Sequence, residues 1–195
     1  MNYQQVKFIQ SIADLTSLPQ DIGIEIAFAG RSNAGKSSAI NAITAIKSLA
    51  KISKTPGRTQ LINFFAVATN KFLVDLPGYG YAKVAVTNKK YWQQILHQYL
   101  TNRKSLRGII LVMDIRQPLK ITDIQMIEYS LFQQLPLHIL LTKADKITRN
   151  LANNTLLTVQ NSLKKYADVI SIQKFSAVTK EGLTEVRTKL DVWYN

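Results

Sequence analysis

The octet GRSNAGKS, residues 30–37, restricts the fold of this chain more than any other feature. It follows the apolar run EIAFA and precedes a helical pattern over residues 37–46. The octet matches G-x-x-x-x-G-K-[ST], which forms a phosphate-binding loop when it stands between a strand and a helix. Its glycines let the backbone come close to phosphate, and the helix that follows presents its positive end. This setting favours a nucleotide loop over the alternative, a glycine-rich structural turn.

Two side chains of this loop carry specific expectations. Lys36 is expected to neutralise the β- and γ-phosphates, and the Ser37 hydroxyl is expected to bind Mg²⁺. Backbone N–H groups of the loop would meet the phosphates as well. The loop residues predicted to contact nucleotide are Gly30, Arg31, Ser32, Asn33, Ala34, Gly35, Lys36 and Ser37.

Strand-like runs alternate with helical patterns along the rest of the chain. Several runs are apolar throughout, as expected for strands buried on both faces of a sheet. The alternation predicts a three-layer α/β fold, with a mostly parallel central sheet and helices on both faces. The length suits one domain, residues 1–195, with a short N-terminal extension over residues 1–22. The expected strands are 25–30, 61–68, 71–76, 108–114, 137–142 and 169–175, and the expected helices are 37–46, 87–100, 122–134, 153–166 and 182–193.

Two further segments are expected beside the phosphate loop. DLPG, residues 75–78, follows a predicted strand at its carboxyl end, where open α/β sheets bind ligands. Asp75 suits a hold on Mg²⁺ through water, and the Gly78 N–H suits a γ-phosphate. The polar stretch KISKTPGRTQ, residues 51–60, is expected to form a mobile loop. Its Thr59 hydroxyl would reach Mg²⁺ only when γ-phosphate is present.

The motif TKAD, residues 142–145, is expected to select the base. The Asp145 carboxylate can accept two hydrogen bonds from guanine, at N1–H and N2–H₂, which adenine does not offer. The Lys143 stem can cover the base plane. The alternative is an ordinary strand-to-helix turn with Asp145 as the helix cap. The tripeptide FSA, residues 175–177, ends the last predicted strand and would present backbone N–H to the base carbonyl.

The charge of the chain is strongly positive and unevenly distributed. The net charge is +13, and residues 47–107 hold eleven Lys or Arg against one acid, Asp75. A polyanion relieves the self-repulsion of such a segment, which favours nucleic acid as a partner over the alternative of a solvated basic face. The eleven basic residues are Lys47, Lys51, Lys54, Arg58, Lys71, Lys83, Lys89, Lys90, Arg103, Lys104 and Arg107.

The composition also excludes several classes of protein. The chain contains no cysteine, which excludes disulfides, thiol nucleophiles and thiolate metal sites. The N-terminal sequence MNYQQVKFIQ lacks the pattern of a signal peptide. No apolar run approaches the length of a membrane span. We therefore expect a cytoplasmic protein that does not interact with membranes.

Taken in order, GRSNAGKSS, TPGRTQLINFF, DLPGYGYAKV, MDIRQPL, TKAD and FSA resemble the motifs of the EngB (YihA/YsxC) family of bacterial ribosome-biogenesis GTPases. This family belongs to the TrmE-Era-EngA-EngB-septin-like superfamily. The similarity extends over nearly the whole chain. It implies a P-loop GTPase domain that binds GTP and GDP with Mg²⁺, hydrolyses GTP slowly and is monomeric. It also implies action on ribosomal RNA and the large-subunit precursor, with a family link to cell division and septation.

The resemblance assigns roles to individual residues. Lys36, Thr59 and Gly78 would be catalytic. Ser37 and Thr59 would hold the metal, with Asp75 acting through water. The nucleotide contacts that it implies beyond residues 30–37 are Gly57, Arg58, Thr59, Gln60, Leu61, Asp75, Leu76, Pro77, Gly78, Thr142, Lys143, Ala144, Asp145, Phe175, Ser176 and Ala177.

Four residues need separate interpretation. Thr142 stands where asparagine is usual in GTPases; we keep guanine as the base and expect that loss of the amide can weaken affinity. Tyr79 stands where many GTPases carry a glutamine that orients the attacking water, so slow turnover is expected. Asn33 has two interpretations, a hydrogen bond that stabilises the loop or a ligand for K⁺ that adds charge beside the phosphates. Arg116, in the DIRQPL motif, is assigned a structural role.

Three other classes of protein remain open at this point. A small-molecule P-loop kinase would need an acceptor pocket and a lid, for which the sequence offers no spare segment. An RNA-binding protein with a relic GTP site would not need the intact Lys36, Ser37, Thr59 and Asp75. An Era-like or EngA-like GTPase would carry an additional domain, and the sequence offers no room for one.

Overall fold

The computed structural model describes residues 1–51, 61–79 and 96–195. Within these ranges seven strands form one sheet in the order β1-β3-β4-β2-β5-β6-β7. The strands are β1 (Lys7–Ile12), β2 (Ile24–Gly30), β3 (Ile62–Ala68), β4 (Lys71–Asp75), β5 (Leu106–Asp114), β6 (Leu137–Thr142) and β7 (Ile170–Lys174). The helices are α1 (Lys36–Thr44), α3 (Ile121–Phe132), α4 (Arg149–Ser162) and α5 (Leu183–Tyr194), and residues 96–102 are also helical.

The sheet is mostly parallel. β2 pairs in parallel with β4 on one side and with β5 on the other, and β6 and β7 continue the parallel order. β3 is the antiparallel strand, paired with β1 and β4. The chain leaves β2 toward β3 on one side, whereas it leaves the neighbouring β4 toward β5 on the other side. The carboxyl end of β2 therefore lies at a topological switch point, where open sheets bind ligands.

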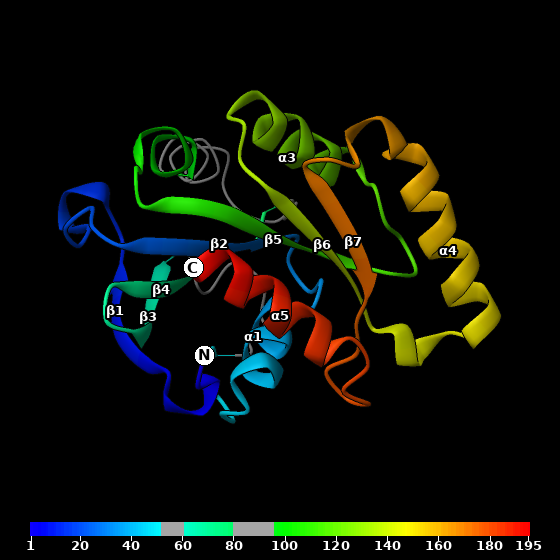
Figure 1. Cartoon of the computed structure of the whole chain (residues 1–195), viewed down its shortest axis with the longest axis horizontal. Helices are drawn as coiled ribbons and strands as arrows, with labels where there is room; N and C mark the ends of the chain where they lie inside the picture. Colours follow the sequence, from blue (N-terminus) through cyan, green and yellow to red (C-terminus); the bar gives the residue numbers. More distant parts are fainter. Residues whose placement is uncertain (52–60, 80–95) are drawn as a thin grey trace.

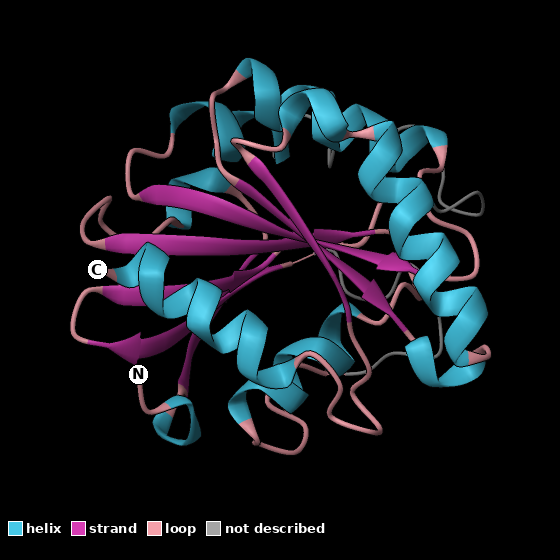
Figure 2. Ribbon diagram, turned by 45° about the vertical axis from the view of Figure 1, so that its right-hand side comes forward, coloured by secondary structure: helices cyan, strands magenta, loops and turns pink. Residues whose placement is uncertain are grey.

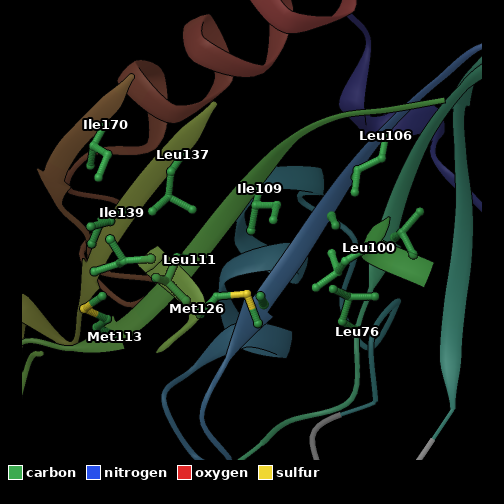
Figure 3. Packing of buried hydrophobic residues seen from close by; sticks show 14 of the residues in the cluster. Leu76, Leu100, Leu106, Ile109, Leu111, Met113, Met126, Leu137, Ile139 and Ile170 are labelled. Atoms are coloured by element: carbon green, nitrogen blue, oxygen red, sulfur yellow. The ribbon is translucent and has the colours of Figure 1, made fainter. Parts of the chain in front are cut away.

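Helices cover both faces of this sheet (Figures 1 and 2). On β5 the buried side chains alternate, because successive strand residues point to opposite faces. Ile109, Leu111 and Met113 join a core that includes Met126 of α3 and buried residues of α4, and Figure 3 shows part of this cluster. Ile110 and Val112 join the second core, beneath α1 and α5. The predicted three-layer architecture is confirmed.

Most expected elements are present, with two differences. Helix α4 begins at Arg149, earlier than the expected residue 153, because Thr148 caps it and accepts a 3.4 Å hydrogen bond from the Leu151 N–H. Strand β1 was not predicted: it is a short, mostly exposed edge strand without a continuous apolar run. Of the helix expected at residues 87–100, the part before residue 96 lies outside the described residues.

The segment expected as an N-terminal extension joins the fold. It contributes β1 to the sheet, and its first residues pack against α5. The amino group of Met1 and the hydroxyl of Tyr3 both donate to Oδ1 of Asp191, at 3.0 and 2.7 Å. Among the helices described, none has both the length and the apolar character required to cross a membrane.

Candidate functional site

The phosphate loop connects the carboxyl end of β2 to the first turn of α1. Gly30 lies against β5, where an added Cβ would be 2.6 Å from the carbonyl oxygen of Val112. Gly35 precedes α1 with a φ of 100°, a conformation that L side chains rarely adopt. The backbone of this loop therefore requires both glycines before any ligand is considered.

Asn33 occupies the tip of the loop and also has a left-handed backbone, with a φ of 64°. Asparagine tolerates this conformation better than most residues do. Its carbonyl oxygen accepts a 2.7 Å hydrogen bond from Nζ of Lys143, while its side chain is exposed. The backbone alone thus gives a reason for asparagine at this position.

Lys36 and Asp75 form an ion pair between the first residue of α1 and the last residue of β4. Both side chains are largely buried, with 11% and 8% of their surface exposed. Nδ2 of Asn63 lies 3.4 Å from the second carboxylate oxygen of Asp75. The fold thus brings together the lysine expected to bind phosphate and the carboxylate expected to act on Mg²⁺ through water.

The segment after β4 is bonded directly to the phosphate loop. The Ser32 N–H donates to the Tyr79 carbonyl at 3.0 Å, and the Tyr79 N–H donates to the Gly30 carbonyl at 3.3 Å. Gly78 lies so close to the loop that an added Cβ would be 3.2 Å from both N and Cα of Ser32. The two segments predicted to surround the γ-phosphate are therefore adjacent, and Leu76 and Pro77 connect them to β4.

Thr142 connects the base-selecting motif to the phosphate loop. Its side chain is buried at the end of β6, and its hydroxyl lies within reach of the carbonyl oxygens of Ala34 and Met113. A hydroxyl has one proton, so it donates to one of these carbonyls at a time. Thr142 thus stabilises the loop. The sequence showed only that threonine stands where asparagine is usual in GTPases, and it did not indicate this role.

Lys143 and Arg116 share one carboxylate. Nζ of Lys143 lies 2.9 Å from Oδ2 of Asp114, and Arg116 donates to both oxygens of the same side chain at 2.9 and 2.7 Å. Burial would raise the pKa of Asp114, but these hydrogen bonds outweigh it and hold the pKa well below its ordinary value. The structural role predicted for Arg116 thus has a partner, Asp114, at the carboxyl end of β5.

Asp145 is oriented by the last motif of the sequence. The Ser176 hydroxyl donates a 2.7 Å hydrogen bond to Oδ1 of Asp145, and this bond is the main cause that lowers the pKa of the carboxyl group. The Ala144 N–H donates to the carbonyl of Phe175 at 3.2 Å, and Ala177 packs against the core beneath α1 and α5. The structure therefore brings TKAD and FSA together.

The donors expected for Mg²⁺ are hard oxygens, which suit this cation. Ser37 offers a hydroxyl in the first turn of α1, and Asp75 offers a carboxylate across the loop. Within the described ranges no three residues of the His, Cys, Asp or Glu type gather into a metal site. Thr59 is the other protein ligand that the sequence predicts for the metal.

One nucleotide segment lies beyond what the structure describes. Residues 52–60 are outside the described residues, and they include Gly57, Arg58, Thr59 and Gln60. Leu61 is described as a half-buried residue directly before β3. The contacts with γ-phosphate and Mg²⁺ that we expect of residues 57–61 therefore stay predictions.

Arg103 requires a correction to the basic surface inferred from sequence. Its side chain is 5% exposed and forms a salt bridge of 2.5 Å with Glu25, which is buried in β2. The Tyr99 hydroxyl donates to the same carboxylate at 2.7 Å. The neighbouring Lys104 and Arg107 are exposed. Arg103 is thus a buried structural cation and not part of a surface that could contact RNA.

A second buried cluster, which the sequence did not indicate, lies beside the phosphate loop. Asp123 of α3 is fully buried. Nε of Arg31 donates to its two carboxylate oxygens at 3.0 and 3.2 Å, and the Tyr79 hydroxyl lies 3.4 Å from Oδ1. No local pattern could have revealed this cluster, because Arg31 and Asp123 are 92 positions apart in the chain.

Known proteins resemble the chain over most of its length. A family model described as "50S ribosome-binding GTPase" matches residues 25–143. A "probable GTP-binding protein EngB" from Coxiella burnetii (strain RSA 493 / Nine Mile phase I) is 52% identical over 192 residues, covering 98% of this chain and 94% of the relative. A protein of the same name from Escherichia coli O157:H7 is 51% identical over 195 residues, covering 100% of this chain and 93% of the relative.

The fold comparison agrees with these matches. A crystal structure of a probable GTP-binding protein EngB aligns with a TM-score of 0.69 and 21% identity, covering 87% of this chain and 98% of that one. At this identity the likeness shows the P-loop GTPase fold, and the curated relatives show the family. The chain belongs to the EngB family of GTP-binding proteins.

Proposed function

We propose that this chain binds GTP and GDP with Mg²⁺, hydrolyses GTP slowly, and acts as a nucleotide-controlled switch in the assembly of the large ribosomal subunit. The observation that carries the proposal is that three loops meet at one edge of the sheet. These are the phosphate loop at residues 30–37, the segment at 75–78, and the base motif at 142–145 with Ser176. The ribosomal part is supported by the matching family model, described as a ribosome-binding GTPase.

The remaining parts of the proposal follow from the family. One GTPase domain, residues 1–195 with the extension 1–22, would act as a monomer in the cytoplasm. The family's link to cell division and septation would reflect either an indirect effect of defective ribosome assembly or a direct role of the protein. Tyr79, in place of a water-orienting glutamine, supports slow turnover without a partner.

Nucleotide binding would rearrange the Lys36–Asp75 pair. Lys36 would turn to the β- and γ-phosphates, which leaves the Asp75 carboxylate to accept a hydrogen bond from a metal-bound water. Bound Mg²⁺ supplies neutralisation of the charge on the phosphate oxygens. The Gly78 N–H would meet the γ-phosphate, since the Gly78 backbone lies close to Ser32 of the phosphate loop.

The choice of guanine is tested by nucleotide binding. We expect fluorescent GDP to bind the chain in Mg²⁺, and unlabelled GDP to displace it while ADP does not. Lys36→Ala should abolish binding of GTP analogues and should leave the fold intact, as measured by circular dichroism. Equal displacement by ADP would contradict the assignment of the base site.

The ribosomal role is tested by sedimentation of the tagged protein with large-subunit particles. We expect association in the presence of the GTP analogue GppNHp and release in GDP. Association that does not depend on nucleotide would contradict the switch, and absence from the particles in both states would contradict the ribosomal role.

The basic segment offers a sharper test of RNA contact. Binding to ribosomal RNA should weaken steeply with salt, because counterions are released from phosphates. In a plot of log affinity against log salt concentration, Lys89→Ala/Lys90→Ala should reduce the slope by roughly one unit for each phosphate that the variant no longer neutralises. Lys164→Ala/Lys165→Ala is the matched control, since it removes the same charge from an exposed pair outside residues 47–107. Equal slopes in the two variants would contradict a footprint at residues 89–90.

A further inference from the structure

Tyr79 occupies the position at which many GTPases carry a water-orienting glutamine, and its contacts show what it does instead. Its ring packs against the core between the sheet and α3, and its hydroxyl reaches Asp123 of α3. Burial raises the pKa of Tyr79 well above its ordinary value. The hydroxyl therefore stays protonated and donates to the carboxylate. The side chain is directed toward α3, where its hydroxyl meets Asp123.

Asp123 connects three segments at once. It accepts hydrogen bonds from Arg31 of the phosphate loop, from Tyr79, and from the Lys120 N–H before α3, the last at 3.1 Å. Arg31 also donates from Nη2 to the Gln117 carbonyl at 2.7 Å. A fully buried carboxylate with an ionic partner and hydrogen bonds is held in one position, since the removal of any partner would leave a buried polar group unsatisfied.

The backbone of Tyr79 is fixed as firmly as its side chain. Its N–H and its carbonyl are both bonded to the phosphate loop, at Gly30 and Ser32. Gly78 comes directly before it and lies so close to Ser32 that an added Cβ would be 3.2 Å from the Ser32 nitrogen. The position of the Gly78 N–H, and hence its distance from a γ-phosphate, thus depends on where Tyr79 is anchored.

We propose that Tyr79 and Asp123 form a positioning pair that fixes the Gly78 amide at the γ-phosphate site. Many GTPases use the side chain at this position to orient water. Here the side chain instead anchors the segment rigidly to α3. This inference rests on the proposed function, because it requires GTP to bind with its γ-phosphate beside Gly78. GDP has no γ-phosphate, so the pair should affect GTP binding and hydrolysis and should spare GDP.

The test removes one atom. Tyr79→Phe keeps the half-buried ring and deletes the hydroxyl. We expect it to weaken binding of GppNHp by about threefold to tenfold, the loss that one ordinary hydrogen bond produces, and to leave GDP affinity unchanged. Single-turnover GTP hydrolysis should slow in the same proportion. Tyr129→Phe is the matched control, since the Tyr129 hydroxyl also lies on α3 but contacts Thr101, at 2.6 Å.

Two further variants separate the pair from a general structural effect. In an Asp123→Ala background, Tyr79→Phe should cause no additional loss of GppNHp affinity relative to GDP, because the partner of the hydroxyl is already absent. If Asp123→Ala does not fold, the rate of GTP hydrolysis by Tyr79→Gln tests the positioning pair instead. Glutamine should slow hydrolysis, as phenylalanine does, because the side chain at this position faces α3.

The outcomes distinguish this inference from the proposed function. Unchanged GppNHp affinity and hydrolysis in Tyr79→Phe would overturn the positioning pair, as would faster hydrolysis in Tyr79→Gln. Equal weakening of GDP and GppNHp would also overturn it, since that result indicates general damage to the loop. Failure of the wild-type protein to hydrolyse GTP would instead reject the proposed function.

Discussion

The Ser176 hydroxyl donates to the Asp145 carboxylate at 2.7 Å, across 31 positions of sequence. The same hydroxyl oxygen accepts from the N–H groups of Val178 and Thr179, at 3.2 and 3.1 Å, so its own proton is directed at Asp145. The bond lowers the pKa of Asp145. The carboxyl group is thus ionised at neutral pH, the form that can accept two hydrogen bonds from guanine.

Asp145→Asn should therefore change the base preference. The amide presents a donor where the carboxylate presented an acceptor, which matches the second ring carbonyl of xanthine. We expect GTP affinity to fall and xanthosine triphosphate affinity to rise, measured by displacement of fluorescent nucleotide. A variant that still binds GTP like the wild type and does not bind xanthosine triphosphate would contradict the assignment. Ser176→Ala is the companion variant: it should weaken GDP and GTP alike, by roughly tenfold, without changing the base preference.

The motifs that the structure brings together could be found in the sequence because each of them is local. The octet at residues 30–37, Asp75 and Thr142 each follow a run of apolar residues that forms a strand, and parallel strands bring their carboxyl ends to one edge. Strand β1 was not found, because an exposed edge strand lacks the continuous apolar run of a buried one.

Contacts between distant residues could not be predicted in the same way. Asp123 and Glu25 look like ordinary polar residues in the sequence, yet they are buried beside Arg31 and Arg103. Charge counts treat every arginine as exposed, although burial decides which of them can meet a ligand. Arg103 was therefore assigned to a basic surface on the basis of composition, and its pairing with Glu25 removes it from that surface.

The Arg103–Glu25 pair should be important for stability and not for RNA binding. Arg103→Ala leaves the Glu25 carboxylate buried without its cation, which should lower the free energy of unfolding by about 3–5 kcal/mol. Lys104→Ala is the matched control, because its side chain is exposed and the change should stay within about 0.5 kcal/mol. Urea unfolding followed by circular dichroism measures both. Equal stability of the two variants would contradict the structural role of Arg103.

His138 predicts a pH dependence of stability. It is buried in β6, with Ser171 and Gln173 each 2.8 Å from one ring nitrogen. Burial is the main cause that lowers its pKa from 6.5 to about 4. Between these values the unfolded chain binds a proton that the folded chain does not, so the free energy of unfolding falls as pH decreases through this window.

The expected loss between pH 7.5 and pH 5.0 is about 2 kcal/mol from this residue alone. His138→Gln cannot take up the proton, so its stability should depend less on pH over the same range. Thermal or urea unfolding of the two proteins at both pH values gives the difference, and carboxyl groups shared by both proteins cancel. Parallel pH profiles for the wild type and His138→Gln would show that His138 is not buried in its neutral form.

Asn33 predicts a response to monovalent cations. Tyr79 is turned toward Asp123 and does not orient the attacking water, so charge added to that of Lys36 and Mg²⁺ beside the β- and γ-phosphates would help to stabilise the transition state. The exposed carboxamide of Asn33 has an oxygen that could bind K⁺, together with backbone carbonyls of residues 55–59, which lie outside the described residues. We therefore expect K⁺ to accelerate GTP hydrolysis severalfold over Na⁺, measured as phosphate release in matched chloride buffers.

The left-handed backbone of Asn33 decides which variant tests this expectation. Alanine would strain the loop at a φ of 64°, whereas glycine keeps the conformation and removes only the carboxamide. Asn33→Gly should abolish the difference between K⁺ and Na⁺ and should still bind GDP. Asn33→Ala should also lose the difference, with weaker GDP binding because of the strain. If the wild type hydrolyses GTP at equal rates in K⁺ and Na⁺, with ribosomal particles both present and absent, asparagine is required here for its backbone alone.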